Sequence, residues 1–318
     1  MPRAESWARY RRRKAPNTEY HQMMLSDLFS QEYAPLRRLG QKSINCYMVS
    51  LRHFDRHLGE SARLDHLTDL TVARFLAARE RETCRATAAR DRVQLLALWR
   101  YAARKRMKAS DGTLLDFPEV PIMRAPARVP VAYTSEDVAL LIREARRFTG
   151  TVAGIPEADW WSSLLLCLWE SGERINAVMH TKWREIDTSG RRITFRAETR
   201  KNQTRDIDRQ ISPTLAAWLS GRIQSPNALV WPWDRNACLL WKRMQGIAAR
   251  ARVQYRGFHG IRRAAVSYAE AACPGAGQRL ADHSSPAVTQ KSYLDPRIVP
   301  QGPAATDLLP ALDLTPPS

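Results

Sequence analysis

The chain has 318 residues, 44% of them hydrophobic and 26% charged, which is typical of a soluble globular protein of about two domains. Lys and Arg outnumber Asp and Glu by 50 to 32, and a net charge of +18 predicts a polyanionic partner, first nucleic acid and second an anionic membrane surface. The five cysteines form no C-x-x-C pair, so neither a disulfide framework nor a zinc site is expected. No run approaches about 18 apolar residues, so neither a secretory signal nor a membrane span is expected.

The N-terminal part of the chain is basic and reads as helical. Residues 1–20 are expected to form a basic arm that is either a solvated extension or a phosphate contact. Residues 21–108 predict a helical domain. Apolar residues recur at intervals of three and four from Ile44 to Phe54, and Thr68 is placed to cap the following helix.

A longer helix is predicted near 84–107. Its apolar side is expected to carry Val93, Leu96, Trp99 and Tyr101. The flanks of this helix are rich in basic residues, which we interpret partly as a solvated face and partly as DNA contacts. The candidates for contact with DNA, here and later in the chain, are Arg85, Arg92, Lys105, Arg200 and Arg263.

Residues 109–133 contain four prolines and an Asp-Gly pair. This density of proline prevents a helix and keeps the chain extended. We therefore predict an interdomain linker here, followed by a second domain at 134–300 and a C-terminal tail at 301–318.

The second domain begins with a capping box. Thr134 and Asp137 are spaced as N-cap and third helical residue, with apolar residues behind them. The block WWSSLLLCLWE is apolar on all sides and predicts a buried central helix. A Ser-Gly pair then ends the helix, and a new helix is expected to start near Arg174.

The alternation of apolar residues around Ile193 and Phe195, and again around Ile207 and Ile211, predicts a β-hairpin with Lys201 near its turn. Most of the chain from 214 to 293 reads as helical. We find no internal repeat.

Three segments of the second domain carry reactive side chains: SGERINAVMHTKWREID, FHGIRRAAVSYAEA and LADHSSPAVTQKSYLDP. Their order and spacing resemble the catalytic domain of the tyrosine recombinase, or phage integrase, family. That family has an ordered signature of Arg, hairpin Lys, His-x-x-Arg, His and Tyr. The matching residues here are Arg174, Lys201, His259, Arg262, His283 and Tyr293.

The resemblance covers about residues 22–300 and implies a mainly α protein with a small β-sheet. An N-terminal helical core-binding domain, of SAM-like fold, would precede a C-terminal catalytic domain. The implied activity is metal-independent DNA strand transfer through a 3′-phosphotyrosine, in the integration or excision of a mobile element. Two positions depart from the family: Ala177 stands where an acidic residue is usual, and Asp282 where glycine is frequent.

Elementary chemistry supports the same residues. Cleavage of a phosphodiester passes through a transition state with extra negative charge, which metal ions neutralise in many nucleases. Here the carboxylates are not grouped with histidines at ligand spacing. Two guanidiniums, Arg174 and Arg262, can stabilise that charge instead. His259 lies three residues before Arg262, on the same face of a predicted helix, and can assist proton transfer.

The resemblance implies the remaining roles. Tyr293 is the expected nucleophile, His283 donates to a non-bridging oxygen, and Lys201 protonates the leaving oxygen, with Lys182 as the alternative lysine. Taken singly, most of these residues also have a structural explanation: Arg174 as a surface residue, Lys201 as a solvated charge, His259 as a helix cap, and His283 and Tyr293 as packing residues. The complete ordered set favours the catalytic interpretation.

Three other functions remain open. A degenerate relative could bind DNA without cutting it, a type IB topoisomerase would use the same tyrosine chemistry without exchanging partners, and a metal nuclease would need ligands that the sequence does not group.

For the recombinase we expect double-stranded DNA as partner, a monomer in solution, a homotetramer on DNA and a cytoplasmic, nucleoid-associated location. An accessory DNA-bending protein is compatible with this. We expect no cofactor and no membrane partner, and the tail either packs on a neighbouring protomer or stays disordered.

Overall fold

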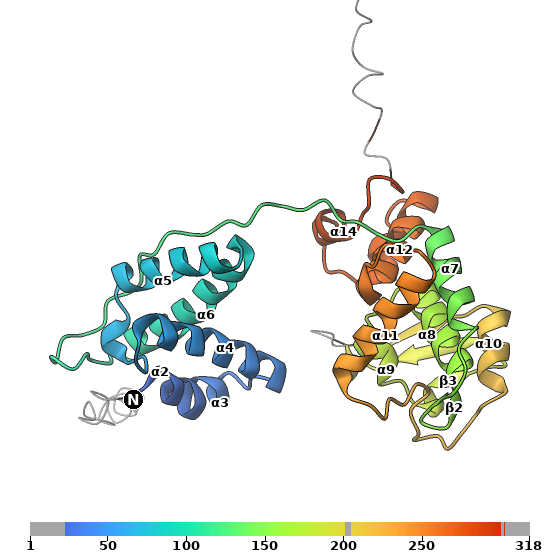
Figure 1. Cartoon of the computed structure of the whole chain (residues 1–318), viewed down its shortest axis with the longest axis horizontal. Coiled ribbons are helices and arrows are strands. Elements are labelled where there is room, and N and C mark those ends of the chain that lie inside the picture. The colour runs from blue at the N-terminus through green and yellow to red at the C-terminus, as the bar shows by residue number, and fades with distance from the viewer. Residues whose placement is uncertain (1–22, 201–204, 300–301, 303–318) are drawn as a thin grey trace, which may run out of the picture. The chain divides into compact units, whose positions relative to one another are not determined.

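The computed structural model describes residues 23–200, 205–299 and 302, and it divides into two compact units, Met1–Ala127 and Arg128–Ser318 (Figure 1). The division falls inside the proline-rich segment 109–133. The N-terminal arm, Lys201 and all of the tail except Gly302 lie outside the described residues. No helix in the described part of the chain is both long enough and apolar enough to span a membrane.

The first unit is built from helices around one apolar core, which includes Phe29, Phe54, Phe75 and Trp99. Thr68 accepts a hydrogen bond from the backbone of Thr71, so the predicted cap is confirmed. The helices are α2 (Leu25–Asp27), a π-helical turn η2 (Leu28–Tyr33), α3 (Ala34–Leu36), α4 (Gln41–Leu58), a 3-10 turn η3 (Leu64–His66), α5 (Asp69–Glu82) and α6 (Arg85–Arg104).

The predicted apolar side of α6 is wrong at Val93, which is 61% exposed. The helix instead buries two charged neighbours, Asp91 and Arg92. Asp91 accepts hydrogen bonds from Ser50 and Arg79, and Arg92 donates to a backbone carbonyl. Because these polar groups have partners, they tolerate burial beside Leu96 and Trp99, which are buried as predicted.

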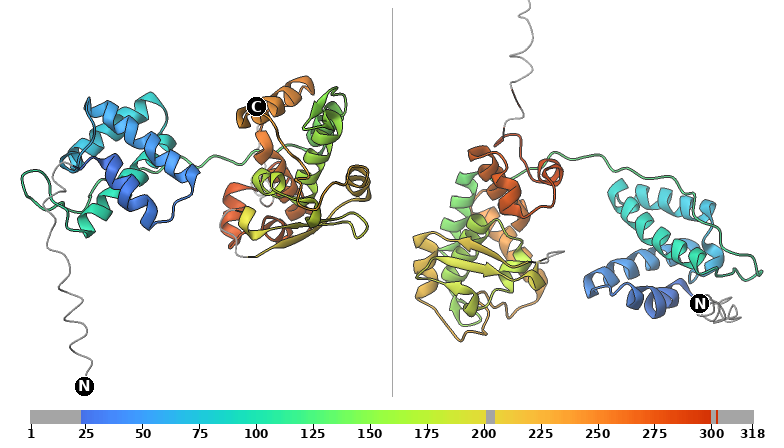
Figure 2. Two further views of the ribbon diagram at one scale, coloured as in Figure 1. Left: turned by 90° about the horizontal axis from the view of Figure 1, so that it is seen from below. Right: turned by 180° about the vertical axis from the view of Figure 1, so that it is seen from behind.

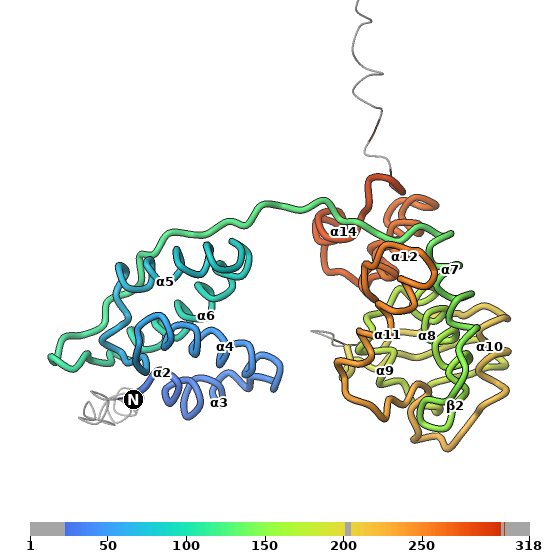
Figure 3. Tube along the Cα trace, viewed as in Figure 1, coloured from blue at the N-terminus to red at the C-terminus, as the bar shows by residue number. Residues whose placement is uncertain are grey.

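The segment after α6 contains no helix as far as Thr134, as the tube in Figure 3 shows. Its first part packs on the first unit. Val120 is buried in that unit's core and accepts the hydrogen bond from Arg92, and the backbone N–H of Glu119 donates to Asp69 at 2.8 Å. The chain is therefore held to the helical unit well past residue 108.

The second unit surrounds a central helix with other helices and places a small sheet at one side. Its helices are α7 (Ser135–Ala145), α8 (Glu157–Ser171), α9 (Ile175–Met179), α10 (Pro213–Ser220), α11 (Ala237–Arg250), α12 (Gly257–Ala272), α13 (Ala276–Ala281) and α14 (Pro286–Ser292), with 3-10 turns η4 (Trp183–Glu185) and η5 (Ala197–Thr199). Its strands are β1 (Thr151–Val152), β2 (Ile155–Pro156), β3 (Ile186–Asp187), β4 (Arg192–Phe195) and β5 (Ile207–Gln210).

The central helix is α8, which packs against α7, α10 and α12. Trp160, Trp161, Leu164 and Leu168 are fully buried on it, and the Trp161 ring stacks on Phe258 of α12 with ring centroids 6.3 Å apart. The prediction of a buried central helix is confirmed. The capping box at the start of α7 is confirmed as well, since the side chains of Thr134 and Asp137 accept each other's backbone N–H.

The predicted hairpin is present as β4 and β5, which pair antiparallel with Ile193 opposite Arg209 and Phe195 opposite Ile207. β3 extends it to three strands in the order β3-β4-β5, visible as yellow-green arrows in Figure 2. Ile193 and Phe195 face the core because alternate residues of a strand share one face. The mainly α class with a small β-sheet is confirmed.

Candidate active site

The first site residue stands where α8 ends. Gly172 follows Ser171 with φ of 61°, and a Cβ at this position would lie 2.9 Å from Cγ of Leu280, so glycine permits both the turn and the close approach of α13. Arg174 then becomes the N-cap residue of α9. Its side chain is half-buried, and its Nη1 is inaccessible with no hydrogen-bond partner among the described residues.

Two further candidates lie on α12. His259 and Arg262 are three residues apart and therefore project from the same side of the helix. Arg262 is only 1% exposed. Its Nη1 donates to the carbonyl of Gly172 and its Nη2 to the carbonyl of Ala281 at 2.9 Å, while its Nε has no partner in the described part of the chain. Backbone carbonyls thus fix the guanidinium between the end of α8 and the end of α13.

The candidate nucleophile completes the cluster from the end of α14. Tyr293 is 6% exposed. Its ring centroid lies 5.1 Å from that of His259 and 4.4 Å from that of His283, and Cζ of Arg262 lies 5.3 Å from it. Both candidate histidines and one candidate arginine therefore contact this tyrosine ring within a single chain.

The backbone around Tyr293 is anchored on both sides. Ser267 of α12 donates to the carbonyl of Tyr293 at 3.0 Å and accepts from the N–H of Asp295 at 3.0 Å. Asp295 in turn accepts from the N–H of Ala132 at 2.7 Å and pairs with Arg297. Burial favours the neutral acid, but hydrogen bonds from Arg297 and Ala132 outweigh it and lower the pKa of Asp295 to about 2.

His283 follows Asp282, whose φ of 52° turns the chain between α13 and α14. Its Nδ1 lies 2.9 Å from the hydroxyl of Thr289, and its Nε2 lies 3.4 Å from Nη2 of Arg262. The Thr289 hydroxyl therefore orients the ring so that Nε2 faces the arginine and Tyr293.

The predicted lysine lies outside the described residues. Lys201 belongs to the connection between β4 and β5, of which residues 201–204 are not described. The alternative, Lys182, precedes η4 and pairs with Leu229 in an isolated bridge. No contact joins Lys182 to the assembled candidates in the described part of the chain, so the structure gives no reason to prefer it.

The electrostatics of the cluster keep both imidazoles neutral near pH 7. The pKa of His259 is lowered to about 4, first because desolvation by its neighbours disfavours the charged ring, although the residue is still exposed to solvent, and second because Arg263, Arg262 and Arg174 repel a further positive charge. Burial and the same two site arginines lower the pKa of His283 to about 4. An anion placed among these groups would meet strong positive potential.

These shifts predict how stability depends on pH. A histidine whose pKa is depressed on folding stabilises the native state above its unfolded pKa of about 6.5, and that contribution is lost as pH falls toward 4. We expect the unfolding temperature to fall by several degrees between pH 7 and pH 5 in thermal scans. The double variant His259→Asn/His283→Asn should show a shallower fall, with His180→Asn controlling for loss of an exposed histidine. Equal slopes in the wild-type protein and the double variant would contradict the assignment.

The five candidates for contact with DNA are not equivalent. Arg85 and Lys105 are exposed, and Arg263 is half-buried and donates to the carbonyl of Ser292 at 3.2 Å. Arg92 and Arg200 are buried, with exposures of 8% and 4%. Arg92 donates to the carbonyl of Val120, and Arg200 pairs with Glu173 and Asp282, so we correct their role from phosphate contact to structural support.

Sequence reasoning missed the acidic residues of the site. Glu173 is fully buried beside Arg200 and Arg262, and Asp295 anchors the segment after Tyr293. Glu173 is adjacent to Arg174 in the sequence, and Asp295 follows Tyr293, the candidate nucleophile, by two residues. Their position next to candidate residues in the sequence was the only clue to this role. Charged residues are usually exposed to solvent, so burial of these two could not be expected from their type.

The assembled groups are two guanidiniums, two imidazoles and a phenol. This set can bind a phosphate by charge-assisted hydrogen bonds and present a nucleophile to it. Within residues 23–200, 205–299 and 302, no group of three or more His, Cys, Asp or Glu residues is arranged to hold a metal ion.

Comparisons with known proteins place the fold. No protein-family model and no curated protein sequence matches the chain. Solved structures do. A lambda integrase dimer bound to a COC′ core site is 15% identical, covers 92% of this chain and 81% of its own, and superposes with a TM-score of 0.65. The Tn1549 transposon integrase in complex with transposon right end DNA is 11% identical, with coverages of 90% and 98% and a TM-score of 0.64.

The XerH site-specific recombinase, bound to a palindromic difH substrate, is similar as well. It is 15% identical, with coverages of 82% and 78% and a TM-score of 0.59. The chain therefore has the tyrosine recombinase fold, as the order of its sequence motifs predicted.

Proposed function

We propose that the protein is a tyrosine site-specific recombinase, which cleaves and rejoins double-stranded DNA through a 3′-phosphotyrosine on Tyr293. The observation that carries the proposal is the contact of the Tyr293 ring with His259, His283 and Arg262. Buried nitrogens of Arg174 and Arg262 lack partners among the described residues, and a scissile phosphate would satisfy them. The net charge of +18 supports DNA as the partner.

The cleavage step forms one bond and breaks one. The Tyr293 oxygen attacks phosphorus, and its proton passes to a neutral ring nitrogen of His259. The bond from phosphorus to the 5′ oxygen breaks, and Lys201 protonates that oxygen as it leaves. The products are a 3′-phosphotyrosine and a free 5′ hydroxyl. The phosphodiester bond energy is kept in the intermediate, so rejoining requires no nucleotide cofactor.

Negative charge that develops on the non-bridging oxygens is stabilised by the arginines. Arg262 is already held in place by two backbone carbonyls, so it needs little reorganisation when the phosphate arrives. Arg174 approaches from the start of α9. His283 donates from Nε2, the nitrogen that the Thr289 contact turns toward the site.

Recombination follows when the 5′ hydroxyl of a second strand reverses the step. We propose that a homotetramer on two DNA duplexes assembles from monomers, with or without an accessory DNA-bending protein, and that the task is the integration or excision of a mobile element. Support comes from the tyrosine recombinase fold, shared with a lambda integrase dimer on a core site and a transposon integrase on transposon end DNA. Arg85 and Lys105 are exposed on the first unit and are proposed to contact phosphates.

Capture of the covalent adduct tests the proposal. The wild-type protein and Tyr293→Phe are expressed in the source cell, and the cells are lysed in strong detergent. Each protein is then purified, and any DNA still attached to it is sequenced. We expect DNA on the wild-type protein only, with one end of the attached strand at a defined sequence. That sequence then serves as the substrate for assays in vitro.

The other outcomes separate the rival functions. An adduct on Tyr293→Phe would show that another residue is the nucleophile. DNA binding by the wild-type protein without any adduct, on a nicked substrate that traps the intermediate, would indicate a non-cutting relative. An adduct at the site without strand exchange between two duplexes would indicate a topoisomerase.

A further inference from the structure

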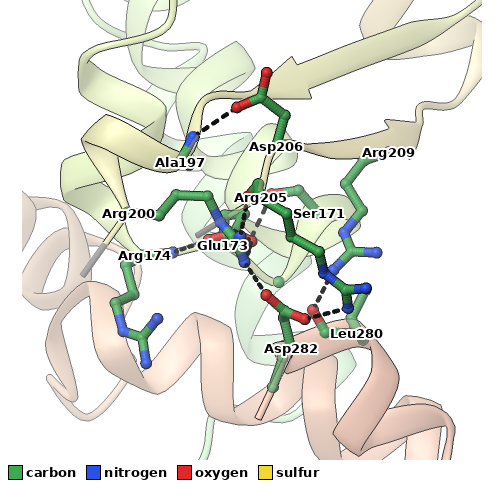
Figure 4. A network of polar contacts seen from close by, with 12 residues as sticks. Ser171, Glu173, Arg174, Ala197, Arg200, Arg205, Asp206, Arg209, Leu280 and Asp282 are labelled. Atoms are coloured by element: carbon green, nitrogen blue, oxygen red, sulfur yellow. Dashed lines mark hydrogen bonds and ion pairs between the residues drawn. The ribbon is translucent and has the colours of Figure 1, made fainter. Parts of the chain in front are cut away.

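A chain of ion pairs links three segments of the second unit that each carry a candidate catalytic residue (Figure 4). Glu173, Arg200 and Asp282 are its central members. Nη2 of Arg200 lies 3.0 Å from Oε1 of Glu173 and 3.1 Å from Oδ2 of Asp282, so one guanidinium bridges two carboxylates. Nε of Arg200 donates to the same Glu173 oxygen at 3.2 Å. We call these three residues the brace.

Each residue of the brace directly precedes a candidate catalytic residue in the sequence. Glu173 precedes Arg174, Arg200 precedes Lys201, and Asp282 precedes His283. A restraint on one residue limits where the next Cα can lie, because successive Cα atoms are about 3.8 Å apart. The brace therefore acts on three catalytic segments that are far apart in the sequence.

The brace is buried, and this gives it a defined geometry. The side chains of Glu173 and Arg200 are both fully inaccessible, and that of Asp282 is 11% exposed. A charge in the interior is tolerated only with well-placed partners, so a shift of any of the three segments would leave one charge unpaired. The arrangement resists relative displacement of the end of α8, the start of the β4–β5 connection and the end of α13.

Further contacts tie the brace to the reactive groups. Oε2 of Glu173 lies 3.7 Å from Nη1 of Arg262 and accepts the backbone N–H of Arg174 at 3.3 Å. Glu173 thus contacts Arg200 through one carboxylate oxygen and approaches both site arginines with the other.

Two arginines on the β5 side of the β4–β5 connection contact the same network. Nη2 of Arg205 donates to Oδ1 of Asp282 at 2.7 Å, and Nη2 of Arg209 donates to the carbonyl of Leu280 at 2.6 Å. The brace therefore fastens this connection to the turn that carries His283 (Figure 4).

Of the two departures from the family signature, Asp282 belongs to the brace and Ala177 does not. Ala177 is buried and has no carboxylate, and the carboxylate of Glu173, four residues earlier, lies beside Arg262 instead. Asp282 has φ of 52°, a conformation that glycine adopts more readily, and its carboxylate pairs with Arg200 and Arg205. The ion pairs of the Asp282 carboxylate explain why a residue other than glycine occupies this strained backbone conformation.

We propose that Glu173, Arg200 and Asp282 are positioning residues, which act together through the Arg200 bridge to hold Arg174, Arg262 and His283 in one arrangement around the scissile phosphate. The inference rests on the proposed function for its effect on cleavage. Its structural half, the coupling of the three segments, does not depend on activity.

Asp282→Gly is the sharpest variant, because it removes the carboxylate and also relieves the positive φ. We expect the unfolding temperature to change little, because relief of the positive φ offsets the lost ion pairs and Arg200 keeps Glu173 as a partner. DNA affinity should stay unchanged or rise, since a negative charge is lost. The single-turnover cleavage rate on saturating DNA should fall by about tenfold to a hundredfold, because small displacements of catalytic groups carry penalties of that size. A merely structural role would lower stability and leave this rate constant intact.

Glu157→Gln is the matched control. Glu157 is a buried carboxylate that accepts two hydrogen bonds from Arg243, at 2.9 and 2.8 Å, but it precedes none of the candidates. We expect this variant to cleave at the wild-type rate. Cleavage by Asp282→Gly at the wild-type rate, beside an active wild-type protein, would overturn the brace and leave the proposed function standing.

A double-mutant cycle tests whether the three residues act as one unit. Glu173→Gln should also lose about tenfold to a hundredfold in cleavage rate, and the double variant Glu173→Gln/Asp282→Gly should lose less than the product of the two single losses, since both act through Arg200. Arg200→Lys keeps the charge but lacks the planar fork that spans both carboxylates, so its rate should lie between those of the wild-type protein and the double variant. Independent, multiplicative losses would contradict a shared bridge.

Hydrogen exchange measures the coupling without cleavage. Asp282→Gly should raise amide exchange in the peptide covering 192–200 as well as around 278–284, while Glu157→Gln should raise it only near its own pair. Unchanged exchange in 192–200 would refute the coupling, even if the wild-type protein proved unable to cut DNA. Failure of the brace and failure of the proposed function therefore give different results.

Discussion

Tyr293→Phe is expected to abolish DNA cleavage while leaving DNA binding intact. The variant removes only the hydroxyl that would attack phosphorus, so cleavage of a nicked substrate should fall by at least about 10⁴-fold, as for loss of a covalent nucleophile in other enzymes. The phenyl ring keeps the contacts with His259 and His283, at 5.1 and 4.4 Å between ring centroids. The free energy of unfolding of Tyr293→Phe should differ from that of the wild-type protein by about 1 kcal/mol or less.

Tyr268→Phe is the control for this experiment. The Tyr268 hydroxyl accepts the N–H of Ser135 at 3.1 Å, so the substitution removes a structural hydrogen bond of a partly buried tyrosine. We expect this variant to cleave DNA at a rate close to that of the wild-type protein. Residual covalent adduct with Tyr293→Phe, at more than about one part in a thousand of the wild-type yield, would refute Tyr293 as nucleophile.

Arg174→Ala is expected to have the second largest effect. Its buried Nη1 has no partner among the described residues, so removal of the side chain breaks few contacts in the free protein. Loss of one donor to a transition state typically lowers a rate constant by about 10²- to 10³-fold. We expect a loss of that size in single-turnover cleavage, with the dissociation constant for DNA raised much less.

Arg184→Ala controls for the loss of a positive charge. Arg184 is an exposed arginine of the same unit, which donates to Asn227 at 2.9 Å. Its removal should weaken DNA binding at most slightly and leave the cleavage rate unchanged. A fall in DNA affinity by Arg174→Ala without a fall in the cleavage rate on saturating DNA would show that the arginine serves ground-state binding, contrary to the proposal.

Arg262→Ala should lose at least as much cleavage as Arg174→Ala, but its structural effect is larger. Arg262 is buried and donates to the carbonyls of Gly172 and Ala281, and it lies 3.7 Å from Glu173. Removing it leaves those acceptors without their donor. For this reason Arg174, rather than Arg262, provides the cleaner measurement of how a site arginine contributes to the rate.

Much of this protein was determined by local features of the sequence. Helix periodicity, the caps at Thr68 and Thr134, the uniformly apolar block of α8 and the strand alternation around Ile193 all act between near neighbours in the chain. They could therefore be predicted from residue type and spacing. The order of Arg174, His259, Arg262, His283 and Tyr293 predicted a tyrosine recombinase fold through its resemblance to that family, not through local spacing.

Only the tertiary structure decided where charge lies inside the protein. Asp91 and Arg92 are buried while Val93 is exposed, because partners from other segments satisfy the charged groups. Arg200 was expected at a DNA surface and instead bridges Glu173 and Asp282. Burial of a charge is favourable only when its partners are in place, and those partners lie 27 and 82 residues away in the sequence. A local pattern carries no information about contacts at that distance, so the support of the site could be read only from the folded chain.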